Sequence, residues 1–74
     1  MNARTVAVTG ATGFLGRHLV KRLAEDGWTV RLLTRRDVLC SEWRNITPQI
    51  VIGDVRDPEA MRRLCVGADL LVHA

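Results

Sequence analysis

The chain has 74 residues, of which 47% are hydrophobic and 26% charged, and its formal net charge is +3. This composition is typical of one small globular domain and excludes an intrinsically disordered chain. No apolar run reaches the roughly 20 residues that span a bilayer, so we expect no membrane partner. The amino end leads into a strand pattern without the apolar segment of a signal peptide, which favours a cytoplasmic location.

The positive charge comes from arginines scattered along the chain, which do not alternate with its few aromatic residues. Nucleic acid is therefore not an expected partner. An anionic small ligand or a solvated surface explains the charge better. Cys40 and Cys65 form no CxxC pair, and His18 and His73 lack the spacing of metal ligands. We expect reduced thiols and no metal site.

The first half of the chain predicts a strand followed by a helix. Residues 4–9 read as a strand buried on both faces, because its side chains are small or apolar in both directions. Residues 13–26 follow as an amphipathic helix, with Leu15, Leu19 and Leu23 on the inner face and Arg17, Lys21, Arg22 and Glu25 on the outer face. Gly27 is positioned to end this helix in a left-handed conformation.

Three further strands are predicted, at residues 28–34, 49–53 and 69–73. Weak periodicity at residues 38–48 allows a short irregular helix near 39–43, before Pro48. A second regular helix begins after Asp57, which is suited to the N-cap, with Pro58 at the first helical position and Glu59 in the first turn. This helix closes at Gly67.

Strands that alternate with helices predict an α/β fold with a parallel sheet. Right-handed crossovers give the strand order 3-2-1-4, which is the first half of a Rossmann doubly wound sheet. The last predicted strand is apolar and would require a neighbour. We therefore expect a fragment truncated after the fourth strand, which is marginally folded or aggregates unless it assembles with a partner.

Glycines at 10, 13 and 16 separate the first strand from the first helix. Gly10 would allow a sharp turn, Gly13 would let the backbone approach a pyrophosphate, and Gly16 would let the helix pack closely on the sheet. The helix amino end would supply N–H donors and partial positive charge to the phosphates. A tight turn without a ligand is the alternative.

The segment Thr9–Gly16 resembles the TGxxGxxG motif of extended short-chain dehydrogenases/reductases, the NAD-dependent epimerase/dehydratase family. Residues 53–57 resemble the family's GD(hydrophobic)xD segment, and residues 71–74 resemble its VxHxA-like strand end. The resemblance covers essentially the whole chain. It implies that residues 1–74 are the N-terminal part of an NAD(P)-binding Rossmann domain, and that Asp54 hydrogen-bonds the adenine amino group. The cofactor-binding residues it implies, together with the glycine turn and the second strand end, are Gly10, Thr12, Gly13, Phe14, Leu15, Gly16, Thr34, Arg35, Arg36, Asp54, Val55 and Ala74.

The end of the second strand bears on the choice of cofactor. The position that is acidic in NAD-preferring relatives falls on Thr34, and Arg35 and Arg36 follow it. A threonine can donate a hydrogen bond and an arginine can grip a 2′-phosphate, so the sequence predicts NADP. The alternative is NAD, with Asp37 as the ribose-binding acid, and both arginines can equally be solvated charges.

The family resemblance implies acid/base catalysis by the Tyr of a YxxxK pair, aided by a Ser or Thr. This chain has no tyrosine, and its one lysine, Lys21, falls on the outer helix face. We therefore assign no catalytic residue. The resemblance implies the cofactor-binding portion of an enzyme acting on a nucleotide sugar or a similar carbonyl or hydroxyl substrate, and it is compatible with a homodimer of the longer protein. A dinucleotide-binding regulator without catalysis and a purely structural domain are the alternatives.

Overall fold

The computed structural model describes residues 4–35, 43 and 45–74 of the chain. Its elements are, in chain order, β1 (Thr5–Thr9), α1 (Phe14–Glu25), β2 (Thr29–Thr34), β3 (Gln49–Ile52), α2 (Pro58–Cys65) and β4 (Leu70–His73). All six lie within one or two residues of the predicted ranges. The short helix predicted at residues 39–43 lies largely outside the described residues.

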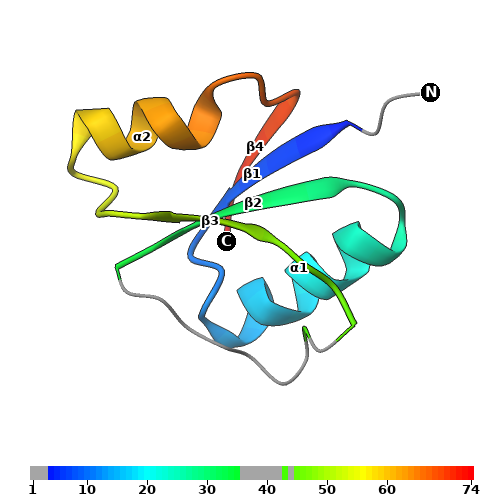
Figure 1. The fold of residues 1–74 in the computed structure, drawn as a ribbon. Helices are drawn as coiled ribbons and strands as arrows, with labels where there is room; N and C mark the ends of the chain where they lie inside the picture. The colour runs from blue at the N-terminus through cyan, green and yellow to red at the C-terminus, as the bar shows by residue number, and fades with distance from the viewer. Residues whose placement is uncertain (1–3, 36–42, 44) are drawn as a thin grey trace.

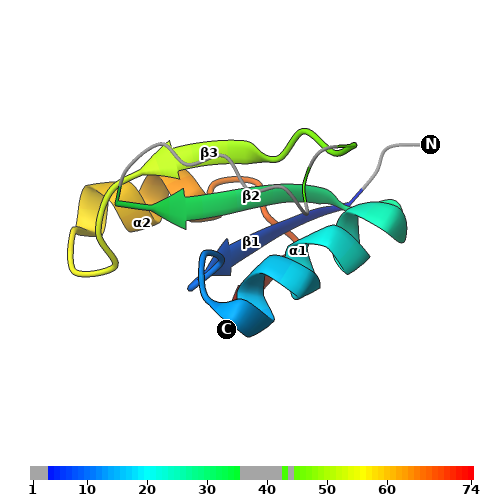
Figure 2. The same cartoon turned by 90° about the horizontal axis from the view of Figure 1, so that it is seen from below.

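The four strands form one parallel sheet in the order β3-β2-β1-β4, as predicted. Helices α1 and α2 lie on opposite faces of this sheet (Figure 1). The view from below shows α1 running beneath β1 and β2, with α2 on the far side (Figure 2). The arrangement is the first half of a doubly wound fold. Within the described residues, no helix is long and apolar enough to cross a membrane.

Each sheet face has its own core. On the α1 side, Val6, Val8 and Leu32 are fully buried with Val20 of the helix. Trp43 completes this core, and its indole N–H donates to the Arg17 carbonyl oxygen over 3.1 Å. The core on the α2 side contains fewer buried residues than the core on the α1 side: Ala7, Leu33, Ala60 and Leu64. Alternate residues of β1 therefore face the two cores, which explains why this strand is apolar in both directions.

Arg31 is a charged residue within an interior strand, and the structure shows what it pairs with. Its guanidinium donates to the carbonyl oxygen of Leu64 over 2.9 Å and also to that of Val66. These carbonyls lie at the carboxyl end of α2, where the last turn of a helix leaves acceptors unpaired. Arg31 thus ties the end of α2 to the middle of the sheet, and the cation suits the negative end of the helix dipole.

The predicted faces of α1 need two corrections. Leu15 was expected on the inner face, but it lies in the first turn of the helix and is 75% exposed. Arg17 was expected in solvent, but it is only partly exposed, and its backbone carbonyl accepts the Trp43 bond. The predicted ends are confirmed: glycines with positive φ follow both helices, Gly27 at +96° and Gly67 at +71°.

Candidate functional site

Three parallel strands, β1, β2 and β3, end at one edge of the sheet, and a groove of about 460 Å³ opens there. Doubly wound sheets bind ligands at this carboxyl edge. The groove brings together six of the residues implied by the sequence, from three separate loops: Gly10, Thr12, Thr34, Arg35, Asp54 and Val55. Leu33, Gly53 and Arg56 complete its lining.

The glycine turn is tightly folded between α1 and β4. Gly10 has φ +73°, and a Cβ there would overlap the carbonyl oxygen of Ala74. The two segments are also joined by a bond from the Ala74 N–H to the Thr9 carbonyl oxygen, 3.0 Å long. A Cβ on Gly16 would overlap the carbonyl oxygen of Gly10 and crowd Ala11. The close approach predicted at Gly16 is therefore to the turn itself, rather than to the sheet.

The amino end of α1 is open. Gly13 is its N-cap residue, and within the described part of the chain no side chain caps this end. A Cβ on Gly13 would meet only the Gly10 carbonyl oxygen, at an ordinary 3.6 Å, so space remains in front of the helix. Helix ends with unpaired N–H groups attract anions.

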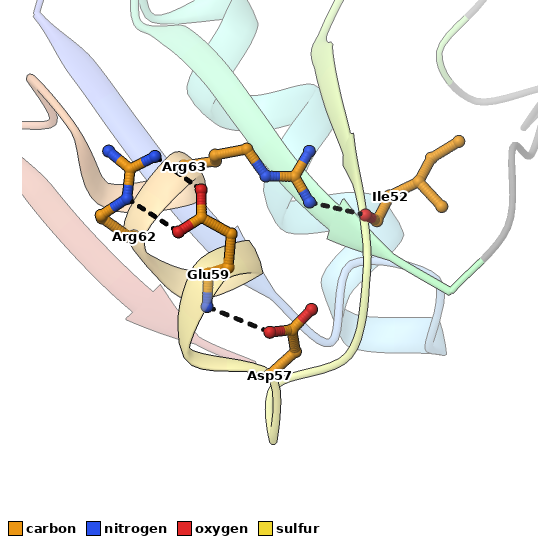
Figure 3. Close-up of polar contacts among 5 residues, drawn as sticks. All are labelled: Ile52, Asp57, Glu59, Arg62 and Arg63. Carbon is orange, nitrogen blue, oxygen red and sulfur yellow. Dashed lines mark hydrogen bonds and ion pairs between the residues drawn. The ribbon is translucent and has the colours of Figure 1, made fainter.

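Helix α2 provides an internal contrast (Figure 3). The Asp57 carboxylate accepts the Glu59 backbone N–H over 3.0 Å, and Glu59 pairs with Arg62 at 2.6 Å. A side-chain cap and an acid in the first turn therefore satisfy the amino end of α2 from within the chain. Of the two described helices, the one that follows the glycine turn is the one with an uncapped amino end.

Asp54 is held by Arg56, two residues further along the loop after β3. Its Oδ1 atom accepts the Arg56 backbone N–H over 2.8 Å and the Arg56 Nε–H over 3.1 Å. Its Oδ2 atom accepts from Nη2 over 2.9 Å. These side-chain and backbone bonds lower the pKa of the Asp54 carboxyl from 3.8 to about 2. Asp54 is thus a fixed and ionised acceptor at the groove.

The end of β2 presents two residues of different character. Thr34 is 6% exposed, and its carbonyl oxygen accepts the Gly53 N–H over 2.8 Å. Arg35 is exposed, and its charge adds a small contribution to the lowered pKa of Asp54. The strand end therefore supplies a cation to the same groove as the Asp54 carboxylate. Arg36 and Asp37, which were central to the NADP and NAD alternatives, lie outside the described residues.

Other implied residues do not line the groove. Gly13 and Gly16 shape the turn, and Ala74 lies behind it at the end of β4. Phe14 and Leu15 project from the first turn of α1, 68% and 75% exposed. The Phe14 ring meets the His18 ring edge to face, with centroids 4.9 Å apart.

Two features were missed by the sequence reasoning. Arg56 lines the groove and pairs with Asp54, and the Asp-x-Arg spacing was the signal that could have found it. The second is a short bond of 2.5 Å between Thr9 Oγ1 and His73 Nδ1, which joins the ends of β1 and β4. The parallel register places these two residues side by side, which only the strand order reveals.

A second groove, of about 440 Å³, lies at the amino ends of β2 and β3, beside the carboxyl end of α1. It contains none of the implied site residues. Within the described residues, no group of three or more His, Cys, Asp or Glu could hold a metal ion. The groove at the carboxyl edge, with a cation and a carboxylate in its lining, is suited to binding an anionic ligand that carries an amino donor.

Comparisons with known proteins indicate the family and the fold of the chain. Residues 6–74 match the model of the NAD dependent epimerase/dehydratase family. The chain is 53% identical over 68 residues to a ceramide reductase of Caulobacter vibrioides, which covers 92% of this chain and 22% of that protein. It is 37% identical over 71 residues to a UDP-glucose 4-epimerase of Neisseria meningitidis, over 82% of this chain and 20% of the epimerase. The chain thus spans about a fifth of the length of these curated relatives.

Among solved structures, the fold is similar to a mutant uronate dehydrogenase of Agrobacterium tumefaciens complexed with NAD. The TM-score is 0.76 at 29% identity, over 97% of this chain and 26% of the dehydrogenase.

Proposed function

The chain belongs to the NAD-dependent epimerase/dehydratase family, and from this premise we propose that it holds the adenosine and pyrophosphate portion of an NAD(P) cofactor in an oxidoreductase or epimerase. The observation that carries the proposal is the groove at the carboxyl edge of the sheet, where an open helix end, a carboxylate and a cation come from three loops. When bound, the cofactor supplies or takes up a hydride. The residues of this chain bind and orient it.

We assign the roles from the chemistry of each group. The open amino end of α1, with Gly13 and the neighbouring Thr12, Phe14 and Leu15, receives the pyrophosphate. The Asp54 carboxylate, beside Val55, accepts a hydrogen bond from the adenine amino group. Gly10 and Gly16 keep the turn compact, and Ala74 borders the cofactor at the end of β4.

We further propose NADP rather than NAD. Arg35 is exposed at the groove and Thr34 ends the strand beside it, so a 2′-phosphate meets a guanidinium instead of the carboxylate that would repel it. Arg36 follows Arg35 in the sequence, and in our proposal its positive charge also contributes to binding the 2′-phosphate. The alternative cofactor, NAD, is supported by the similar uronate dehydrogenase structure, which is complexed with NAD.

The test is a titration of the chain with NADP⁺ and with NAD⁺, before and after Arg35→Asp. A lost charge-assisted contact contributes about 1.5–3 kcal/mol, so the NADP⁺ affinity should fall by about 10- to 150-fold. The NAD⁺ affinity should stay the same or rise. Arg62→Asp on α2, which is not among the groove-lining residues, is the control. An NADP⁺ affinity that barely moves in Arg35→Asp would refute the phosphate role, and a chain that binds neither dinucleotide would refute the whole proposal.

For the longer protein we propose a reductase. The ceramide reductase shares 53% identity with this chain and the UDP-glucose 4-epimerase 37%, and this difference supports a ceramide-like lipid over the nucleotide sugar that the sequence resemblance suggested. A dinucleotide-binding regulator without catalysis is the alternative. Three measurements on the longer protein distinguish these readings. A reductase oxidises NADPH only when a lipid with a ketone is present to accept the hydride, and an epimerase converts UDP-glucose to its 4-epimer without net oxidation of the cofactor. A regulator binds the dinucleotide and does neither.

A further inference from the structure

The acceptor capacity of Asp54 is nearly used up within its own loop. An ionised carboxylate offers about four lone-pair positions. Oδ1 accepts two bonds and Oδ2 accepts one, all from Arg56. One acceptor position is left, and it belongs to Oδ2. The Asp54 side chain is 29% exposed, so this position is accessible to a ligand in the groove.

Arg56 also fixes the direction in which Asp54 accepts. Its planar fork binds both carboxylate oxygens, and its backbone N–H binds one of them, so the carboxylate cannot rotate without breaking several bonds. The Arg56 side chain itself is 84% exposed and shows no role in the core. We infer that Arg56 is a positioning residue that makes Asp54 selective for the 6-amino group of adenine over the 6-oxo group of hypoxanthine.

The physical reason lies in the different edges of the two bases. Adenine presents an amino donor at position 6, which suits the one acceptor position left on Oδ2. Hypoxanthine presents a carbonyl oxygen there, which a fixed carboxylate repels, and its N1–H donor lies to one side. A carboxylate that is free to rotate can turn towards N1–H and accept it. Releasing Asp54 from Arg56 should therefore weaken the discrimination between the bases, and not merely the binding.

The inference rests on the proposed function, and its test separates the two. The affinities of the chain for NADP⁺ and for its hypoxanthine analogue, deamino-NADP⁺, are measured for wild type, Arg56→Gln, Arg56→Lys and Arg62→Gln. The last is a matched control, because Arg62 grips the exposed Glu59 with the same Nε and Nη2 fork outside the groove. In wild type we expect adenine to be preferred by about tenfold, as for one hydrogen bond to a charged group.

In Arg56→Gln this preference for adenine should fall by about three- to tenfold, because a carboxylate that can rotate also accepts a hydrogen bond from hypoxanthine. Arg56→Lys, which keeps the charge but loses the fork, should give an intermediate preference. Arg62→Gln should match wild type. An unchanged preference in Arg56→Gln, or an equal gain or loss of affinity for both dinucleotides, overturns the positioning role while the proposed function stands. A wild-type chain that binds neither dinucleotide overturns both.

Discussion

The Asp54 carboxyl gives a residue-scale prediction about pH. Arg56 lowers its pKa in the folded chain to about 2, below the ordinary 3.8 that it regains on unfolding. A depressed pKa means that the ionised form stabilises the fold above about pH 4, and that this contribution is lost as the pH falls through 3.8 towards 2. In the Asp54→Asn variant, the free energy of unfolding should therefore fall less steeply across this window than in wild type.

The measurement is urea unfolding at a series of pH values between 5 and 2. Glu25→Gln, at the exposed end of α1, serves as the control for removal of an acid. Parallel stability curves for wild type and Asp54→Asn would contradict the assignment of a bound, ionised carboxylate. Because Arg56, the partner of Asp54 in this ion pair, is 84% exposed, the difference is expected to be small.

Individual residues also show where a sequence ceases to predict a site. The positions of Gly10, Thr34 and Asp54 follow from motifs at strand ends, because parallel strands bring these ends to one edge. The exposure of Leu15 does not follow, because a helical period gives the apolar face of a helix but not how much of each turn the sheet covers. The partners of Arg31 do not follow either, because they depend on where the crossover places the end of α2.

At the scale of elements, the two helices differ in how their amino ends are satisfied. Asp57 and Glu59 complete α2 from within the chain, and the Asp-Pro-Glu signal made this predictable. Helix α1 begins at Gly13 without a cap among the described residues. A cap stabilises a helix, so the uncapped end beside the groove supports the proposal that a pyrophosphate binds there.

This contrast predicts that stability and binding respond in opposite directions to Gly13→Asp. The backbone of Gly13 is extended, with φ −72° and ψ 170°, and space exists for a side chain. An aspartate there should cap α1 and restrict the unfolded chain, which adds about 0.5–1 kcal/mol to the free energy of unfolding. The same carboxylate would repel a pyrophosphate, so NADP⁺ affinity should fall at least about tenfold.

Gly13→Asn is the matched control, because asparagine caps a helix equally well without charge. It should gain similar stability and lose less affinity. Thermal melts and dinucleotide titrations of the three proteins supply both measurements. If Gly13→Asp bound NADP⁺ as tightly as wild type, the pyrophosphate would not lie at the end of α1.

At the scale of the whole molecule, the described residues provide no further strand at either edge of the sheet. Strands β3 and β4 are its outer members. Leu70 and Leu71 of β4 are 46% and 50% exposed, and they alternate between the two faces. On the other edge, Ile52 is 51% exposed. Helices α1 and α2 lie mainly over β1, β2 and β3, so β4 is the least covered strand among the described residues.

An apolar edge strand with unpaired backbone groups is a template for pairing with another chain. We therefore predict that the 74-residue chain self-associates, with a mean mass in sedimentation equilibrium that rises with concentration. Leu71→Lys should reduce this association, because a charge on an edge strand opposes pairing. Val66→Lys, at an exposed apolar site after α2 and outside the strand, controls for the added charge. A chain that remains monomeric at every concentration and melts in one sharp transition would show that two small cores suffice, and that the β4 edge needs no partner.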